Sequence, residues 1–202
     1  MPTIVSMRSG EATPCQDGTL PLGSCDAGWY RGPMNRSLLG DPFAHHVWAT
    51  LRLVDTCLSL SPEQLGRSVP GTYGSILETM RHLVGSDSSY LFALTAGRTP
   101  VTNKDQMDLP ELRTAMEGNG AAWSSLLAQD LDPDFVVVRR RADGSETHAP
   151  VGIRLAQALH HGTDHRSQIC TALTALAVEP PAIDVWDFAA QDGRLTEVPP
   201  TS

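Results

Sequence analysis

The 202-residue sequence predicts an all-α protein, a four-helix bundle with a small β-hairpin in the connection before the fourth helix. Two observations support this fold class. Four stretches place apolar residues at steps of three and four, the spacing that puts them on one face of an α-helix. Before the last of these stretches, a β-branched run leads to Asp143-Gly144, a pair typical of a tight hairpin turn.

We expect three segments along the chain: a poorly ordered N-terminal leader over residues 1–40, the bundle over residues 41–195, and a frayed tail over residues 196–202. The leader is rich in Gly, Pro and Ser and has no apolar periodicity. Its two cysteines, Cys15 and Cys25, could pair, but free thiols are the expectation for a chain in the cytoplasm.

The first helix is predicted to begin at Asp41-Pro42, because Asp is a favoured N-cap and Pro a favoured first helical residue. Its apolar stripe consists of Phe43, Val47, Leu51, Val54 and Leu58. His45 and His46 lie on the same helix. We expect both at the boundary of the core, although one of them could approach a metal or substrate pocket.

The second helix is predicted to begin at Ser75, which forms the capping-box pattern S-x-x-E with Glu78. Its apolar stripe consists of Ile76, Met80, Leu83, Tyr90 and Leu94. His82 lies beside this stripe, so on its own it would be a boundary histidine. Glu78 lies one turn before His82 and could orient it, but capping is the role we favour for this carboxylate.

The third helix is predicted from Asp108, Pro110 and Glu111, which repeat the start signals, and should continue to about Gln129. Di-iron carboxylate bundles need the pattern E-x-x-H, which occurs nowhere in the chain. The sequence therefore excludes that class of metal site.

The segment FVVVRRRADGSETHAPV predicts the hairpin, with Arg139, Arg140 and Arg141 as solvated charges at the edge of a strand. A short helical tail should follow the fourth helix, and we expect its Trp186 to pack over the bundle.

The stretch Leu155–Leu176 predicts the fourth helix, and it contains His160, His161 and His165 within six residues. His161 and His165 are four residues apart, so they lie about 40° apart around the helix and one turn apart along it. Two imidazoles held in this way can bind one metal ion. The zincin motif is excluded, because it has Glu directly after the first His, where this chain has Gly162.

The nine residues HGTDHRSQI, from His161 to Ile169, resemble the fourth-helix motif H-x-x-x-H-R-G-Q-I of the DinB-like (DinB/YfiT-like) superfamily, with Ser167 where that motif has Gly. FAHHVWATLRLVD is similar to the first helix of these proteins, and GSILETMRHLVGSDSSYL to their second-helix block. The resemblance implies a bundle in which His82 joins His161 and the histidine one turn later, His165, as the metal ligands.

Three neutral imidazoles would leave at least one position of a divalent metal open, which is typical of catalytic rather than structural sites. Zinc is the ion we expect, with nickel or iron(II) as alternatives, since imidazole suits all three. An open metal can lower the pKa of a water molecule for hydrolysis, or bind a thiol as its thiolate. Arg166 and Gln168 would either support the site or pack the helix.

DinB-like proteins include S-transferases that use low-molecular-weight thiols such as mycothiol or bacillithiol, and members proposed as metal-dependent hydrolases. The resemblance therefore implies a metal-dependent S-transferase acting on an electrophile. A metal-dependent hydrolase of amides or esters is the second hypothesis, and a non-catalytic, stress-linked metal- or ligand-binding bundle is the third. DinB-like proteins are often homodimers, and we expect a homodimer here.

The net charge of −8 argues against nucleic-acid binding and against a polybasic membrane anchor, both of which need a basic surface. No apolar run approaches the ~20 residues of a membrane span, and the N-terminus lacks the apolar core of a signal peptide. We therefore expect a cytoplasmic protein that acts on a small molecule. Cys57 and Cys170 should be small apolar residues within helices.

Overall fold

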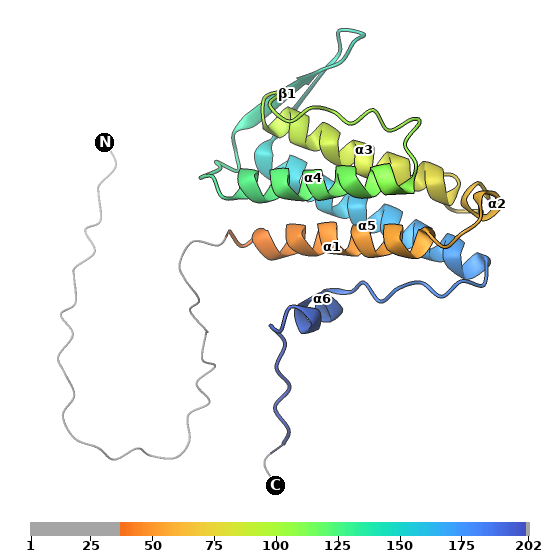
Figure 1. The fold of residues 1–202 in the computed structure, drawn as a ribbon. Helices are drawn as coiled ribbons and strands as arrows, with labels where there is room; N and C mark the ends of the chain where they lie inside the picture. The colour runs from red at the N-terminus through yellow and green to blue at the C-terminus, as the bar shows by residue number, and fades with distance from the viewer. Residues whose placement is uncertain (1–36, 201–202) are drawn as a thin grey trace, which may run out of the picture. The chain divides into compact units, whose positions relative to one another are not determined.

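The computed structural model describes residues 37–200, and within them the predicted fold class is confirmed (Figure 1). Four long helices make the bundle, and a two-stranded antiparallel hairpin precedes the last of them. The elements are α1 (Gly40–Cys57), α2 (Pro62–Leu65), α3 (Ile76–Leu94), α4 (Leu109–Leu127), β1 (Val136–Arg140), β2 (Glu146–Pro150), α5 (Val151–Ala175) and α6 (Val185–Gln191).

The capping boxes predicted for the second and third long helices are both formed. At the start of α3, the Glu78 amide donates to Ser75 Oγ, and the Ser75 amide donates to the Glu78 carboxylate. Asp108 and Glu111 exchange the same two hydrogen bonds at the start of α4. These bonds satisfy backbone donors that have no partner within the helix, so each helix begins where its cap stands.

Two helix starts differ from the prediction. α1 begins at Gly40, and its N-cap residue Leu39 makes no side-chain cap, so Asp41 is an acidic residue of the first turn instead of the cap. α5 begins at Val151, directly after β2, one turn before the predicted stretch. No capping signal in the sequence marks this start, because the N-cap residue, Pro150, has no side chain that can accept a hydrogen bond.

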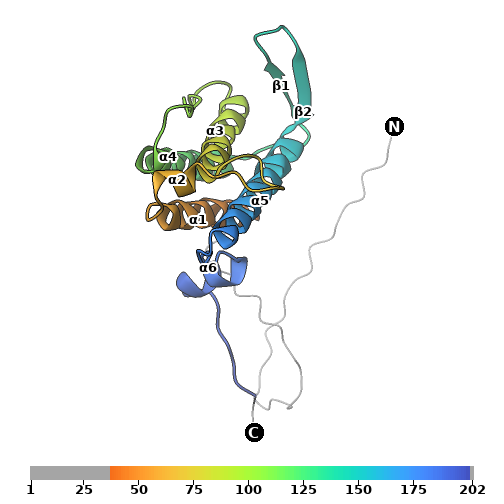
Figure 2. The same ribbon diagram turned by 90° about the vertical axis from the view of Figure 1, so that its right-hand side faces the viewer.

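The hairpin pairs Val136 with Pro150 and Arg140 with Glu146, and it extends beyond the bundle (Figure 2). Its turn holds Gly144 at φ +83°, a left-handed conformation that favours glycine. Arg154, on the first turn of α5, fixes the base of the hairpin, since its Nη2 donates to backbone carbonyls of both strands.

The long helices bury two apolar clusters between them, with α1 and α3 each packing against both α4 and α5. One cluster lies near α2 and includes Leu53, Met80, Leu112 and Leu173. The other lies nearer the hairpin and includes Phe43, Leu91, Trp123 and Leu155. Cys57 belongs to the first cluster, as predicted, whereas Cys170 is only half-buried at its edge.

The predicted helical tail is α6, which lies against α1, but the prediction for Trp186 is wrong. That side chain is 68% exposed. Phe188 packs against Trp48 of α1 instead, with ring centroids 5.4 Å apart, and Trp48 donates to the Gln191 amide oxygen. The orientation of α6 therefore directs the ring of Phe188, and not that of Trp186, toward the bundle.

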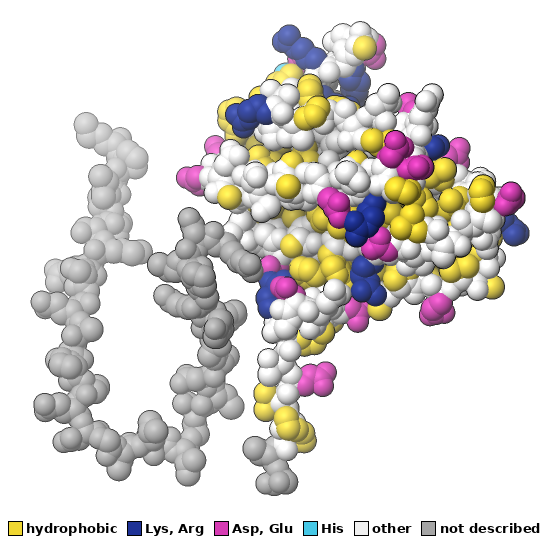
Figure 3. All heavy atoms as spheres, in the orientation of Figure 1, with side chains coloured by type: hydrophobic (Ala, Val, Ile, Leu, Met, Phe, Trp, Pro, Cys, Tyr) yellow, Lys and Arg dark blue, Asp and Glu magenta, His cyan; other side chains and the backbone are white. Residues whose placement is uncertain are grey.

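In Figure 3, basic side chains gather at the top of the view around the hairpin, and acidic and basic side chains are interspersed over the helices below it. Among the residues that the structure describes, no helix is both long and apolar enough to cross a bilayer.

Candidate metal centre

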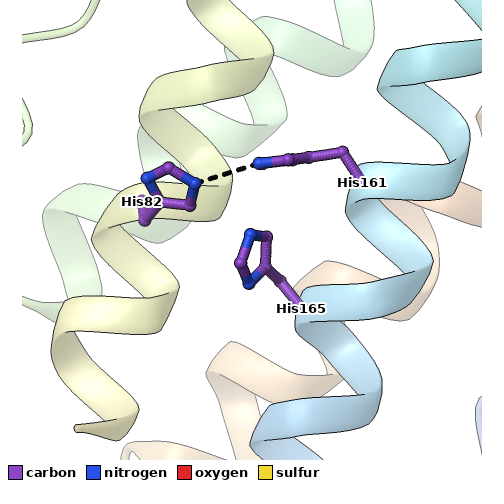
Figure 4. Close-up of side chains that lie close together, drawn as sticks. All are labelled: His82, His161 and His165. Carbon is purple, nitrogen blue, oxygen red and sulfur yellow. Dashed lines mark hydrogen bonds between the residues drawn. The ribbon is translucent and has the colours of Figure 1, made fainter. Parts of the chain in front are cut away.

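The structure brings together the three histidines that the sequence singled out. His82 projects from α3, and His161 and His165 project from successive turns of α5 toward it (Figure 4). One ring nitrogen from each can be chosen so that all three nitrogens lie within 4.8 Å of one another. His165 is buried, and the other two imidazoles are half-buried at the edge of the bundle.

The spacing of the imidazoles fits one shared ion. The Nε2 atoms of His82 and His161 lie 3.0 Å apart. Two nitrogens bound to one tetrahedral zinc at the usual Zn–N length would lie about 3.3 Å apart. The observed separation is therefore within a few tenths of an ångström of the one that a shared ion needs.

Gln168 fixes the orientation of His165. Its Oε1 accepts a hydrogen bond from the Tyr73 amide at 2.9 Å and lies 3.0 Å from Nδ1 of His165. A carbonyl oxygen can only accept, so the proton of the neutral ring lies on Nδ1. Nε2 of His165 is left with its lone pair free for a metal, the arrangement in which an outer hydrogen bond sets the tautomer of a ligand histidine.

Two tyrosines line the site, and neither was expected there from the sequence. The ring of Tyr73 stacks on His82 with centroids 4.1 Å apart and meets His165 edge-on at 5.5 Å. Tyr90 meets His161 edge-on at 5.7 Å. Tyr73 precedes α3 in an irregular loop, so no helical periodicity could have linked it to the histidines.

Residues 34–196 match the family described as the DinB family, which is most of the chain. The chain belongs to the DinB family. A search of curated proteins found no match to it. DinB proteins are metal-binding helical bundles, and in this DinB chain the histidine trio is the group that could hold the ion.

The surroundings favour the neutral form of two imidazoles of the trio, those of His161 and His82. Burial, and then the nearby His165 and His82, lower the pKa of His161 to about 4. Burial also lowers the pKa of His82, with further contributions from His165 and Lys104. A metal binds the neutral imidazole, so at pH 7 neither of these two histidines would have to lose a proton before binding one.

No fourth protein ligand joins the trio in the part of the DinB domain that the structure describes. His160 is exposed, and His148 bonds Glu146 on the hairpin. His45 bonds the Ile183 carbonyl, and burial lowers its pKa. Both carboxylate bonds of Glu78 go to Ser75, so the capping role is confirmed and this residue makes no bond to His82.

His46 overturns the expectation of a boundary residue. It is 0% exposed, in the middle of the DinB bundle, where its ring bonds Asp87 and Arg166. No pattern within α1 singled out this position, because the residues that His46 bonds lie on α3 and α5. Gly162 was a visible clue, since a helical glycine often marks a place where another element approaches the backbone.

Proposed function

We propose that this DinB protein binds a divalent metal ion through His82, His161 and His165, with zinc preferred and nickel or iron(II) as alternatives. We propose further that it transfers a low-molecular-weight thiol, of the mycothiol or bacillithiol type, to an electrophile. The observation that supports the proposal is the convergence of three imidazole nitrogens with no fourth protein ligand in residues 37–200. Such a set leaves at least one coordination position for a reactant.

A bound metal would supply Lewis acidity, which lowers the pKa of a thiol or a water molecule at the open position. The protein's own side chains would hold the histidine rings in position. Gln168 holds the His165 ring with its proton away from the site, and Tyr73 covers one face of His82. In the transfer, the thiol proton goes to solvent, the sulfur forms a C–S bond, and the leaving group departs with its bonding electrons.

The surroundings of the trio favour a thiol over water as the nucleophile. A hydrolase usually needs a positioned general base beside the attacking water. In residues 37–200, no carboxylate bonds any of the three imidazoles. The Asp87 oxygens are taken by His46 and Trp123, and those of Glu78 by the helix cap. Metal-dependent hydrolysis of amides or esters is therefore the second candidate, and a non-catalytic, stress-linked binding bundle is the third.

The test is to incubate the zinc-loaded protein with mycothiol or bacillithiol and the electrophile monochlorobimane. The proposal predicts conjugation faster than with metal-free protein and faster than with a loaded His161→Ala variant. Equal rates in all three samples would contradict thiol transfer. Ester cleavage that needs metal but no thiol would establish the second candidate, and tight metal binding without any turnover would establish the third.

We also propose that the protein is a homodimer, following the closed symmetry common among soluble oligomers. Sedimentation should then show a species of twice the 21.7 kDa chain mass. A single species of 21.7 kDa at micromolar concentration would contradict the dimer.

A further inference from the structure

A layer of buried polar side chains crosses the bundle between its two apolar clusters. Its members are His46 from α1, Asp87 from α3 and Arg166 from α5, and α4 contributes the indole N–H of Trp123, whose ring belongs to the second apolar cluster. None of these side chains is more than 4% exposed. Burying a carboxylate and a guanidinium is costly unless both are paired and hydrogen-bonded. Hydrogen bonds within this layer must therefore offset that cost.

The hydrogen bonds of the layer allow only one placement of protons. A guanidinium has no acceptor, so Arg166 Nη1 donates to Nδ1 of His46 at 2.7 Å. The proton of the neutral His46 ring is then on Nε2, which donates to Asp87 Oδ1 at 3.1 Å. The second carboxylate oxygen, Oδ2, accepts from the Trp123 indole at 2.8 Å. His46 thus links a buried positive charge to a buried negative charge without carrying charge itself.

This layer joins the same two helices that carry the metal ligands, at the same level of the bundle. Asp87 lies on α3 five residues after His82, and Arg166 directly follows His165 on α5. Within this layer, the hydrogen-bonded connection from Asp87 on α3 to Arg166 on α5 therefore passes through the His46 ring.

His46 also presses directly on α5 between the two ligands of that helix. A Cβ on Gly162 would lie 2.3 Å from Cε1 of His46, far inside contact distance. The imidazole therefore rests on the bare backbone of α5 at Gly162, one residue after His161 and three before His165. A helix held both by this contact and by the Arg166 bond is restricted in rotation and in sliding.

From these contacts we propose that Asp87, His46 and Arg166 are positioning residues, which hold α3 and α5 at the separation and rotation that let His82, His161 and His165 share one ion. This inference deepens the proposed function and rests on its metal site. It assigns to His46 a role distinct from that of a ligand, since the ring bonds Asp87 and Arg166 and lies inside the core.

Two substitutions at His46 separate positioning from simple packing. His46→Leu keeps an apolar volume but removes both hydrogen bonds. His46→Gln retains one acceptor and one donor on its terminal amide, so it can restore both links. The matched control is Leu112→Ala, which removes buried volume from α4 and leaves the polar layer intact.

The affinity for Zn²⁺ is measured by competition with a chromophoric chelator, beside the thermal midpoint of each metal-free protein. His46→Leu should weaken zinc binding roughly tenfold or more, the range for residues that orient ligands. His46→Gln should recover most of that loss. Leu112→Ala should lower the thermal midpoint but leave zinc affinity unchanged. Zinc affinity in His46→Leu equal to that of the wild type, or lowered only as much as in Leu112→Ala, would overturn the proposal.

Hydrogen exchange of the metal-free proteins tests the positioning role separately from the metal. The amides of residues 158–169 in α5 should exchange faster in His46→Leu than in Leu112→Ala, relative to the rest of each protein. Unchanged local protection would overturn the role of His46 even if the wild type binds zinc. If residues 158–169 exchange faster in His46→Leu but the wild type binds no zinc, the proposed function is refuted and the structural role of His46 is retained.

Discussion

Nδ1 of His165 lies 3.0 Å from Oε1 of Gln168, three residues further along α5. The same oxygen accepts a hydrogen bond from the Tyr73 amide, so one side chain connects the loop before α3 to a candidate ligand on α5. This relationship decides which nitrogen of His165 faces the candidate metal, and it gives Gln168 a purpose that the sequence analysis had left open between support and packing.

Replacing Gln168 by Leu should weaken zinc binding about 10- to 100-fold, because His165 loses the partner that fixes its tautomer and ring orientation. The fold should remain, since Gln168 is only partly buried. Competition titration measures the change. The control is Gln157→Leu, on the exposed face of the same helix, whose amide donates a hydrogen bond to the Tyr90 hydroxyl at 3.4 Å. Equal zinc affinities for both variants would mean that Gln168 does not orient the ligand.

Gly162→Ala should lower the free energy of unfolding by about 1–3 kcal/mol, the usual cost of overpacking a core. The added methyl would lie 2.3 Å from Cε1 of His46, and this clash should outweigh the gain of up to ~1 kcal/mol from replacing a helical glycine.

Urea unfolding measures the effect, and Gly118 provides the control because a Cβ there meets nothing within 4 Å. Gly118→Ala, on the exposed face of α4, should raise the free energy of unfolding by about 0.5–1 kcal/mol. A Gly162→Ala protein as stable as the Gly118→Ala protein would show that α1 does not press on α5 at this position.

The free energy of unfolding of the metal-free protein should decrease as the pH falls from the pKa of its histidines in the unfolded chain toward their lower pKa in the folded protein. The pKa of His161 is about 4 in the folded protein, and a free histidine in the unfolded chain titrates near ~6.5. Between these values the unfolded chain binds more protons than the folded one, so the free energy of unfolding decreases as the pH falls. His82 and His45 add to this slope, since their pKa values are also lowered.

Urea denaturation at pH 7.5, 6.5, 5.5 and 4.5 tests this dependence, and His161→Leu should show a shallower decline than the wild type. An unfolding free energy that rises on acidification over this range, or an equal slope in the variant, would show that the His161 imidazole is not held neutral by its surroundings.

Much of the architecture could be predicted because its signals are local. Capping boxes mark the starts of α3 and α4, and the Asp143-Gly144 turn marks the hairpin. The pairing of His161 with His165 also follows from spacing within one helix. The placement of His82 beside them needed the family resemblance, since nothing in α3 alone reveals which helix it faces.

The remaining features depend on contacts between segments far apart in the sequence. His46 is buried because α3 and α5 meet around it, and no pattern within α1 distinguishes it from His45. Tyr73 reaches the site from an irregular loop. Which aromatic ring of the tail contacts the bundle depends on the orientation of α6, which directs Phe188 and not Trp186 to α1.

The most direct test is the metal content of the purified protein, measured by elemental analysis beside single His→Ala variants. We predict about one divalent ion per wild-type chain and far less in His82→Ala, His161→Ala and His165→Ala. His160→Ala, which removes the exposed neighbour of a ligand, should retain the wild-type content. Equal metal content in the wild type and all three ligand variants would contradict a shared ion between α3 and α5.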